Sequence, residues 1–305
     1  MAHRDATHAL APGDEILGKY RVIKVLGAGG MGAVVEAENL RTSRRVAIKA
    51  LQGGAKPGNA GRRFLNEARA AASLTHPNSV DVLDLDQDAD GTLYIVQELL
   101  SGESLYDRLA REHKVPWREA FELMIPVMSA LAEAHRKGIV HRDVKPENIF
   151  LHEAAAGMIV PKVIDFGVAR FTRTDERLTR NDRVVGTPYY MSPEQASGER
   201  ELDGQTDVWA LGVVLYEMLS GHAAFEGQNL KQVMSDIIAG TLTPLRLRAP
   251  DLPADVCAVV ERAMKVDRGA RYATMGDMLD ATRKRLGGHA YGWAYSGPIG
   301  AILAP

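Results

Sequence analysis

The chain has 305 residues, of which 46% are hydrophobic and 25% charged, with a formal net charge of −2. These values are typical of a soluble globular protein long enough for two packed lobes. The chain has 37 basic and 39 acidic residues and so lacks the strong basic bias that nucleic-acid binding requires, and we expect no nucleic-acid partner. No run of 18 apolar residues occurs, and we expect no membrane span in this chain.

The cysteine content and the N-terminal residues both favour a cytoplasmic location. Cys257 is the only cysteine, so no internal disulfide can form, which is typical of a reducing compartment. It lies in an apolar pattern, and we expect a buried packing residue, with a reactive thiol as the alternative. The first residues hold no apolar core of the length that a signal peptide needs.

Hydrophobic periodicity and turn residues divide the chain into four parts. They are a polar arm at 1–17, a small lobe at 18–100, a larger lobe at 101–287, and a tail rich in glycine and alanine at 288–305. In the small lobe we expect strands at 20–26, 33–37, 46–51, 80–85 and 93–98, with one helix at 62–74. In the larger lobe we expect helices at 117–137, 206–220, 230–239, 254–265 and 275–286, with short strands at 149–151 and 162–164.

These elements predict an α+β fold, in which a small antiparallel sheet with one helix joins a larger helical lobe. The interface between two such lobes is a favoured place for a ligand-binding cleft. Pro126 lies inside the helix predicted at 117–137 and should kink it or remove one of its hydrogen bonds.

A glycine-rich segment, Gly27-Ala28-Gly29-Gly30-Met31-Gly32-Ala33-Val34, matches the pattern G-x-G-x-x-G-x-V. Glycines let the backbone approach phosphate groups closely and adopt conformations that a Cβ atom forbids. Dinucleotide-binding folds use a similar pattern, but there it opens a helix. Here the residues that follow are predicted to form a strand, which argues against that alternative.

Lys49 is the charged residue in the apolar strand pattern Val46-Ala47-Ile48-Lys49. A buried ammonium group needs an ionic partner, and Glu67, on the helix predicted at 62–74, is the candidate. Taken alone, the two residues are also compatible with an exposed lysine on a strand and a glutamate on a helix surface.

Two acidic motifs follow in the larger lobe. The segment His141-Arg142-Asp143-Val144-Lys145-Pro146-Glu147-Asn148 matches H-R-D-x-x-x-x-N, and Asp165-Phe166-Gly167 follows a predicted strand. Phosphoryl transfer needs a carboxylate that orients the attacking hydroxyl and accepts its proton, oxygen ligands for Mg²⁺, and cations that offset developing charge. The carboxylate can be supplied by Asp143, the Mg²⁺ ligands by Asn148 and Asp165, and the cations by Lys49 and Lys145. The order and spacing of the motifs therefore indicate phosphoryl transfer.

With these motifs the chain resembles the protein kinase family over residues 20–286. The segments 143–148 and 186–194 resemble the serine/threonine branch, and Gly27–Lys49 with Met191-Ser192-Pro193-Glu194-Gln195 resembles the eukaryotic-like kinases of bacteria. The resemblance implies a bilobal protein-kinase-like fold. It also implies a serine/threonine protein kinase that uses ATP and Mg²⁺ and transfers the γ-phosphoryl group to hydroxyls of protein substrates.

The resemblance assigns roles to single residues. Asp143 is expected to be the catalytic base, Lys145 to contact the γ-phosphate, and Lys49 to bind the α- and β-phosphates while paired with Glu67. Asn148 and Asp165 are expected to bind Mg²⁺. The ATP site is expected to comprise Leu26, Gly27, Ala28, Gly29, Gly30, Met31, Gly32, Val34, Ala47, Lys49, Gln97, Glu98 and Leu100. Within this set, Glu98 to Leu100 would form the hinge beside adenine, and Gln97 the back wall of the pocket.

Further residues are expected to support the site. Asp207 should hold the catalytic segment from a buried helix, and Glu194 should form a structural ion pair with Arg271. Ser192 departs from the family pattern, which has alanine at this position.

The segment between Asp165 and Glu194 carries the candidate regulatory residues. We expect the protein to phosphorylate itself at Thr179, with Thr172 and Thr174 as secondary sites and Arg142 as the residue that binds the phosphate. Such a reaction between copies implies self-association. Thr187 is expected to contact Asp143 and Lys145 instead. The arginines at 170, 173, 177, 180 and 183 leave two alternatives open, a solvated loop or a phosphate-binding segment.

Two other functions remain as alternatives at this point. One is a pseudokinase scaffold that binds nucleotide without turnover, and the other is a phosphotransferase that acts on a small molecule. The presence of Lys49, Asp143 and Asp165 argues against the first. The segment 186–194, suited to docking a polypeptide, argues against the second. The sequence leaves open whether the chain is part of a longer kinase.

Overall fold

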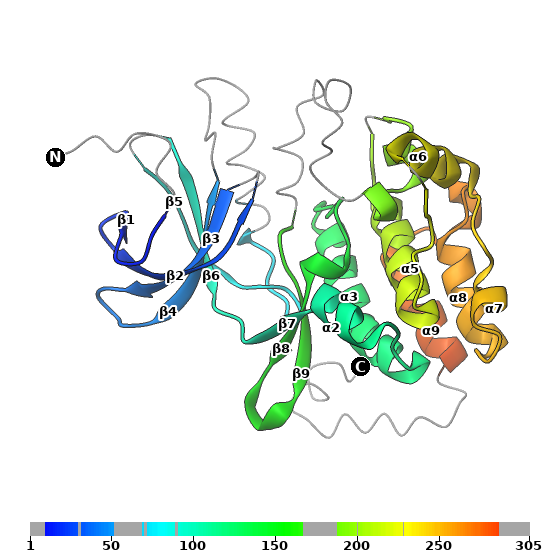
Figure 1. The fold of residues 1–305 in the computed structure, drawn as a ribbon, viewed down its shortest axis with the longest axis horizontal. Coiled ribbons are helices and arrows are strands. Elements are labelled where there is room, and N and C mark those ends of the chain that lie inside the picture. The colour runs from blue at the N-terminus through cyan, green and yellow to red at the C-terminus, as the bar shows by residue number, and fades with distance from the viewer. Residues whose placement is uncertain are drawn as a thin grey trace.

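The structure is a computed structural model, and it describes residues 10–29, 32–51, 69, 72–88, 91–166, 188–199, 201–227 and 229–286. Strands dominate up to Glu98 and helices dominate beyond Ser104 (Figure 1). The predicted α+β fold of two lobes is confirmed.

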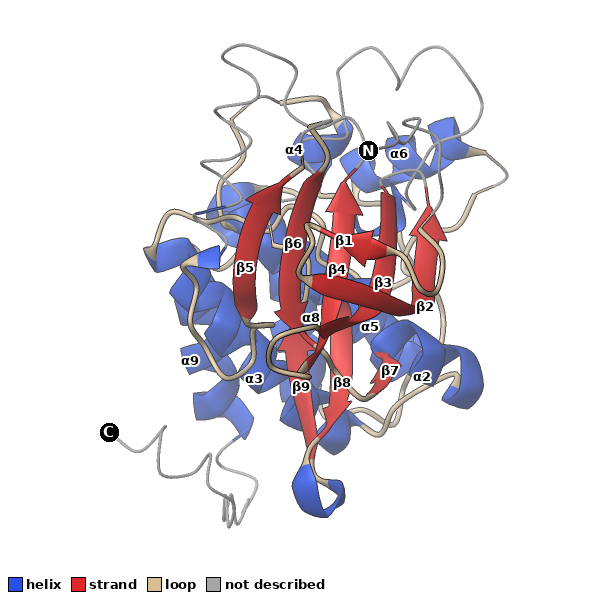
Figure 2. Cartoon of the chain, turned by 90° about the vertical axis from the view of Figure 1, so that its left-hand side faces the viewer, coloured by secondary structure: helices blue, strands red, loops and turns tan. Residues whose placement is uncertain are grey.

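Among the described residues of the N-terminal lobe, six antiparallel strands form a sheet in the order β1-β2-β3-β4-β6-β5 (Figure 2). They are β1 (Glu15–Ile16), β2 (Tyr20–Gly29), β3 (Gly32–Asn39), β4 (Arg45–Leu51), β5 (Val82–Gln87) and β6 (Leu93–Glu98). Val35, Ala37, Val46, Ile48 and Val96 meet in one buried cluster, because alternate residues of a strand face the same side of a sheet. The strand predicted at 80–85 lies two residues later than expected. The helix predicted at 62–74 falls largely outside the described residues.

The C-terminal lobe is built around helix α5 (Gln205–Ser220). Nearly every side chain of α5 is buried, including those of Trp209 and Tyr216, as expected of a helix that is apolar all round. It packs against α3 (Trp117–Arg136), α8 (Ala254–Ala263) and α9 (Met275–Leu286). The lobe also contains α2 (Leu105–Glu112), α4 (Pro193–Ala196), α6 (Leu230–Ala239) and α7 (Leu245–Arg248), and a sheet of β7 (Gly102–Ser104), β8 (Ile149–Glu153) and β9 (Ile159–Val163).

Most predicted helices agree with the structure within one or two residues. Helix α3 continues through Pro126, which is buried, and its end is followed by Gly138 in the left-handed region at φ 75. Helix α2 was not predicted, although Ser104 and Asp107 form a capping box at its start. Cys257 is buried as expected, and burial raises the pKa of its thiol. Among the helices that the structure describes, none is long and apolar enough to cross a membrane.

The prediction of a strand at 162–164 was wrong in its start, because β9 begins at Ile159. Pro161 sits inside the strand, where a residue without an N–H group would usually interrupt the pairing. In β9 it does not, because this is an edge strand and the N–H of Val163 already points away from β8, donating to the carbonyl of Asn78. Residues two apart point the same way, so the ring of Pro161 replaces no bond to β8.

Gly212 permits the contact between α5 and the end of α8. A Cβ atom there would lie 2.9 Å from Ala263 Cβ and 2.9 Å from Met264 Cγ.

We expect Gly212→Ala to lower the free energy of unfolding by about 1–3 kcal/mol through overpacking, measured by urea denaturation. Gly276→Ala in α9 is the control, because its Cβ would meet only Thr274 Oγ1 at 3.5 Å. Equal stability of Gly212→Ala and the wild type would contradict the expectation.

Candidate active site

A buried carboxylate in the first turn of α5 holds the segment that precedes Asp143. Asp207 is 0% exposed, and it accepts hydrogen bonds from the backbone N–H groups of His141 and Arg142, both at 2.8 Å. Nε2 of His135, on α3, lies 2.7 Å from the same carboxylate. Burial alone would raise the pKa of Asp207, but the hydrogen bond and charge of His135, with the contacts of His141, outweigh it and lower this pKa. The predicted contact of Asp207, from a buried helix, with this segment is confirmed.

Asp143 follows this segment, and its carboxylate is half-buried. Its Oδ2 lies 2.9 Å from Nζ of Lys145 and 3.0 Å from Nδ2 of Asn148. Nδ2 of Asn148 also donates to the backbone carbonyl of Asp143 at 2.7 Å. A 3₁₀ turn over Pro146–Asn148 folds the chain back so that the three side chains meet.

Lys49 connects the N-terminal sheet to the second acidic motif. Its Nζ, reaching out from β4, lies 2.7 Å from Oδ1 of Asp165, just beyond β9. Asp165 has φ 63, a conformation that few residues other than glycine adopt and one that is often found at functional sites. Glu67, the predicted partner of Lys49, lies outside the described residues.

The two acidic motifs also contact each other through their neighbours. Phe166 is buried, and its ring centroid lies 4.9 Å from that of His141. Nε2 of His141 lies 2.9 Å from the carbonyl oxygen of Ile164. A carbonyl only accepts, so this nitrogen carries the proton. The N–H of Ile164 donates in turn to the carbonyl of Asn148 at 3.0 Å. Asp143 and Asp165 are therefore held in a fixed relation.

The glycine-rich segment forms a hairpin of β2 and β3, in which Gly27 pairs with Val34 and Gly29 with Gly32. A strand, not a helix, follows the glycines, which confirms the prediction against a dinucleotide-binding turn. Gly32 has φ 136, and a Cβ there would fall 1.8 Å from the carbonyl oxygen of Ala50, so no larger residue fits. Leu26, one of the residues predicted to line the ATP site, is 46% exposed.

Glu98, at the predicted hinge, forms an ion pair that the sequence analysis missed. Its Oε1 lies 2.6 Å from Nζ of Lys162, on β9, and accepts from the backbone N–H of Asp81 at 2.9 Å. The carboxylate of Glu98 is therefore bonded to Lys162 of β9 and to the backbone of Asp81. The sequence did contain a signal for this ion pair, because Lys162 is a charged residue in the apolar pattern Val160-Pro161-Lys162-Val163. The same kind of pattern around Lys49 predicted a buried cation that needs a partner.

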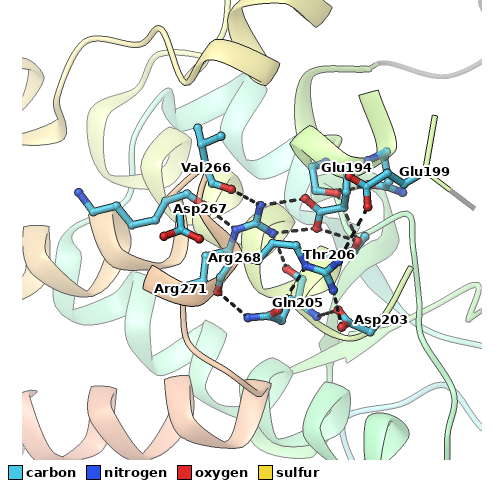
Figure 3. Close-up of polar contacts among 12 residues, drawn as sticks. Glu194, Glu199, Asp203, Gln205, Thr206, Val266, Asp267, Arg268 and Arg271 are labelled. Carbon is cyan, nitrogen blue, oxygen red and sulfur yellow. Dashed lines mark hydrogen bonds and ion pairs between the residues drawn. The ribbon is translucent and has the colours of Figure 1, made fainter. Parts of the chain in front are cut away.

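The predicted pair of Glu194 and Arg271 is confirmed (Figure 3). Nη1 and Nη2 of Arg271 each donate to one oxygen of Glu194 at 2.8 Å, and the Arg271 side chain is 0% exposed. Its guanidinium also donates to the carbonyls of Lys265 and Val266. Burial by itself would raise the pKa of Glu194, but the hydrogen bond and charge of Arg271 lower it overall. The pair fixes α4 against the segment that precedes α9.

Comparison with known proteins assigns the chain to a family. The model of the protein kinase domain matches residues 20–280. The chain belongs to the protein kinase domain family. Similar curated proteins are the serine/threonine-protein kinase pkn3 of Myxococcus xanthus (39% identical, covering 82% of this chain and 46% of that protein), PrkC of Bacillus subtilis (36%, 87% and 40%) and PknB of Mycobacterium leprae (36%, 85% and 42%). The chain spans less than half the length of these relatives.

Solved kinase structures share the fold. The PknI kinase domain of Mycobacterium tuberculosis superposes with a TM-score of 0.70 at 26% identity, covering 91% of this chain and 99% of that one. Rad53 in complex with AMP-PNP superposes with a TM-score of 0.71 at 24% identity, covering 87% of this chain and 65% of that one. The second likeness is one of fold alone.

This kinase domain brings predicted site residues together in two groups, Lys49 with Asp165, and Asp143 with Lys145 and Asn148. The backbone of Ile164 links the two groups through its bond to Asn148. Several others fall outside the described residues, namely Gly30, Met31, Glu67, Thr172, Thr174, Thr179 and Thr187. Two supporting contacts were not expected from the sequence. They are the bond from His135 to Asp207 and a bond from Gln195 to the backbone of Arg142.

The ion pair of Glu194 predicts a large loss of stability when its partner is removed. Arg271→Ala leaves a carboxylate buried without its cation, so we expect the free energy of unfolding to fall by about 3–5 kcal/mol. Arg246→Ala is the matched control, because Arg246 pairs with Glu261 at 3.5 Å on the exposed surface, where an ion pair contributes about 0–1 kcal/mol. Urea denaturation of both variants measures the difference. Equal losses in the two would contradict a structural role of the buried pair.

Proposed function

We propose that this kinase domain is an active serine/threonine protein kinase that transfers the γ-phosphoryl group of ATP to a hydroxyl of a protein. The observation that carries the proposal is the half-buried carboxylate of Asp143 beside Nζ of Lys145 and Nδ2 of Asn148. The choice of serine and threonine is supported by the names of the similar proteins pkn3, PrkC and PknB. A cytoplasmic setting is part of the proposal, supported by the single cysteine.

The proposed reaction is an in-line displacement. The oxygen of the substrate hydroxyl attacks the γ-phosphorus, Asp143 accepts the proton of that hydroxyl, and the bond to the bridging oxygen of ADP breaks. Lys145 is proposed to offset negative charge on the transferred group, because its Nζ lies 2.9 Å from Asp143. Lys49 is proposed to hold the α- and β-phosphates, since Asp165 keeps its ammonium group at the edge of the site. Such fixed charges need no reorganisation during the reaction.

The residues at the site fit a bound Mg²⁺ ion. The N–H donors of Asn148 are directed to Asp143, which leaves its amide oxygen as a ligand atom, and Asp165 contributes a carboxylate. Oxygen ligands of this kind are those that Mg²⁺ prefers. When bound, Mg²⁺ would supply neutralisation of the phosphate charges. The ATP phosphates are proposed to lie under the hairpin of residues 27–34, and adenine beside Leu26, Val34 and Ala47 at the hinge of Glu98 to Leu100, with Gln97 behind.

Loss of the proposed base or of the proposed phosphate-binding lysine should abolish most activity. We expect Asp143→Asn to reduce the rate by about 10²–10⁴-fold and Lys49→Met by about 10²–10³-fold through lost charge stabilisation. Transfer of labelled phosphate from Mg-ATP to a generic protein measures both. Lys24→Met is the control, because this exposed lysine of the same sheet pairs with Glu36 at 3.2 Å and should keep full activity. Equal incorporation by all four proteins would overturn the proposal.

Control by self-phosphorylation is a further part of the proposed function. Thr179 is the proposed site, with Thr172 and Thr174 as secondary sites, and Arg142, directly before Asp143 in the sequence, is the proposed phosphate-binding residue. We expect dephosphorylated wild type to gain activity on incubation with ATP, at a rate that rises with enzyme concentration because two copies must meet. Thr179→Ala should not gain it, whereas Thr172→Ala should. Full activation of Thr179→Ala would remove Thr179 from the mechanism.

A further inference from the structure

Gln195, on the short helix α4, contacts the backbone directly before the proposed base. Its Nε2 donates to the carbonyl oxygen of Arg142 at 2.8 Å. That carbonyl belongs to the peptide group that joins Arg142 to Asp143. The position of this peptide plane sets where the Cα atom of Asp143, and with it the carboxylate, lies.

The backbone at Arg142 needs such support on both sides. Its φ of 66 is unfavourable for a residue with a side chain. Asp207 fixes the peptide group before Arg142 by accepting from its N–H at 2.8 Å. Gln195 fixes the peptide group after it, and the N–H of that same group points to Nδ1 of His141 at 3.3 Å. Asp207 and Gln195 therefore constrain the two peptide planes on either side of one strained residue.

The side chain of Gln195 is itself held in a single orientation. Its Oε1 accepts from the backbone N–H of Ser192 at 3.0 Å, and an N–H group can only donate. The amide nitrogen must then face Arg142, whose carbonyl can only accept. Ser192 is buried and shares a hydrogen bond of 3.2 Å with Thr206, which donates to Glu194 at 3.2 Å. Serine at this position, the departure from the family pattern, is the N-cap of α4, and its Oγ accepts from the backbone N–H of Gln195 at 3.4 Å.

We infer that Gln195 is a positioning residue, which acts through Asp143 and couples the segment 188–196 to the catalytic backbone. The inference rests on the proposed function, in which Asp143 accepts the substrate proton. Proton transfer depends on donor and acceptor positions to within a fraction of an ångström, and a misplacement of about 1 Å costs on the order of 10²-fold in rate. Lys49 and Asp165, which are proposed to bind Mg-ATP, are not among the hydrogen-bond partners of Gln195 in the described part of the chain, which are Ser192 and Arg142. Loss of Gln195 should therefore leave nucleotide affinity unchanged.

The first test is Gln195→Glu, which keeps the shape of the side chain but replaces its donor with an oxygen that repels the carbonyl of Arg142. We expect kcat to fall by about 10–10²-fold with the KM for ATP unchanged. Gln87→Glu is the matched control, because Nε2 of Gln87, on β5, likewise donates to a backbone carbonyl, that of Gly91, at an exposed position of the N-terminal lobe. It should keep the wild-type kcat.

A double-variant measurement separates positioning from general loss of structure. Gln195→Met, similar in length but without a donor, is combined with Asp143→Asn. If Gln195 acts through Asp143, the methionine should reduce the rate in the wild-type background and change little in the Asp143→Asn background. Equal reduction in both backgrounds, or a wild-type kcat in a folded Gln195→Met, would overturn the inference.

The same measurements separate this inference from the proposed function. If the wild type transfers no phosphate, or if Asp143→Asn is as active as the wild type, the proposed function fails and the inference fails with it. If the wild type is active and Asp143→Asn is not, the function stands. A Gln195→Glu variant with normal kcat would then overturn the positioning role alone.

Discussion

The active site depends on one buried carboxylate, that of Asp207. It lies in the first turn of a helix whose side chains fill the centre of the larger lobe, so its position is as fixed as the packing of that core. A buried charge is costly unless it is hydrogen-bonded, and Asp207 meets this need with the backbone N–H groups of His141 and Arg142 and the ring of His135. The bonds that stabilise the carboxylate are therefore the same bonds that shape the catalytic segment.

A second principle is the pairing of acidic groups in the site with cations. Asp143 lies beside Lys145, Asp165 beside Lys49, and Glu98 beside Lys162. Paired charges avoid most of the penalty of an unpaired buried ion. The first two pairs carry the proposed chemistry, whereas the third joins the end of β6 to β9. Pairing of opposite charges therefore serves both the proposed reaction and the contact between the lobes.

The sequence was sufficient to predict features that depend on local residue patterns or on recognisable motifs. The strands of the N-terminal sheet follow from alternation of apolar residues, and the partners Glu194 and Arg271 follow from the family resemblance, although 77 residues separate them. Contacts between polar side chains and backbone groups far away in the sequence could not be predicted. The bond from Gln195 to Arg142 depends on where α4 lies in space, and no periodicity encodes it. The early start of β9 was not predicted because a proline usually marks the end of a strand. Pro161 fits in β9 only because its nitrogen faces away from the neighbouring strand β8, and the sequence does not show this orientation.

The bond between Arg142 and Asp207 spans 65 residues of sequence, and this order matters while the chain is being synthesised. A nascent chain leaves the ribosome from its N-terminus, and a domain acquires its structure as a unit. The catalytic segment emerges before the helix that shapes it, and α5 emerges before α8 and α9 cover it. Until then Trp209 and its apolar neighbours face water, a state in which partly made chains tend to aggregate. The segment that bears Asp143 therefore gains its shape only after α8 and α9 have closed over α5.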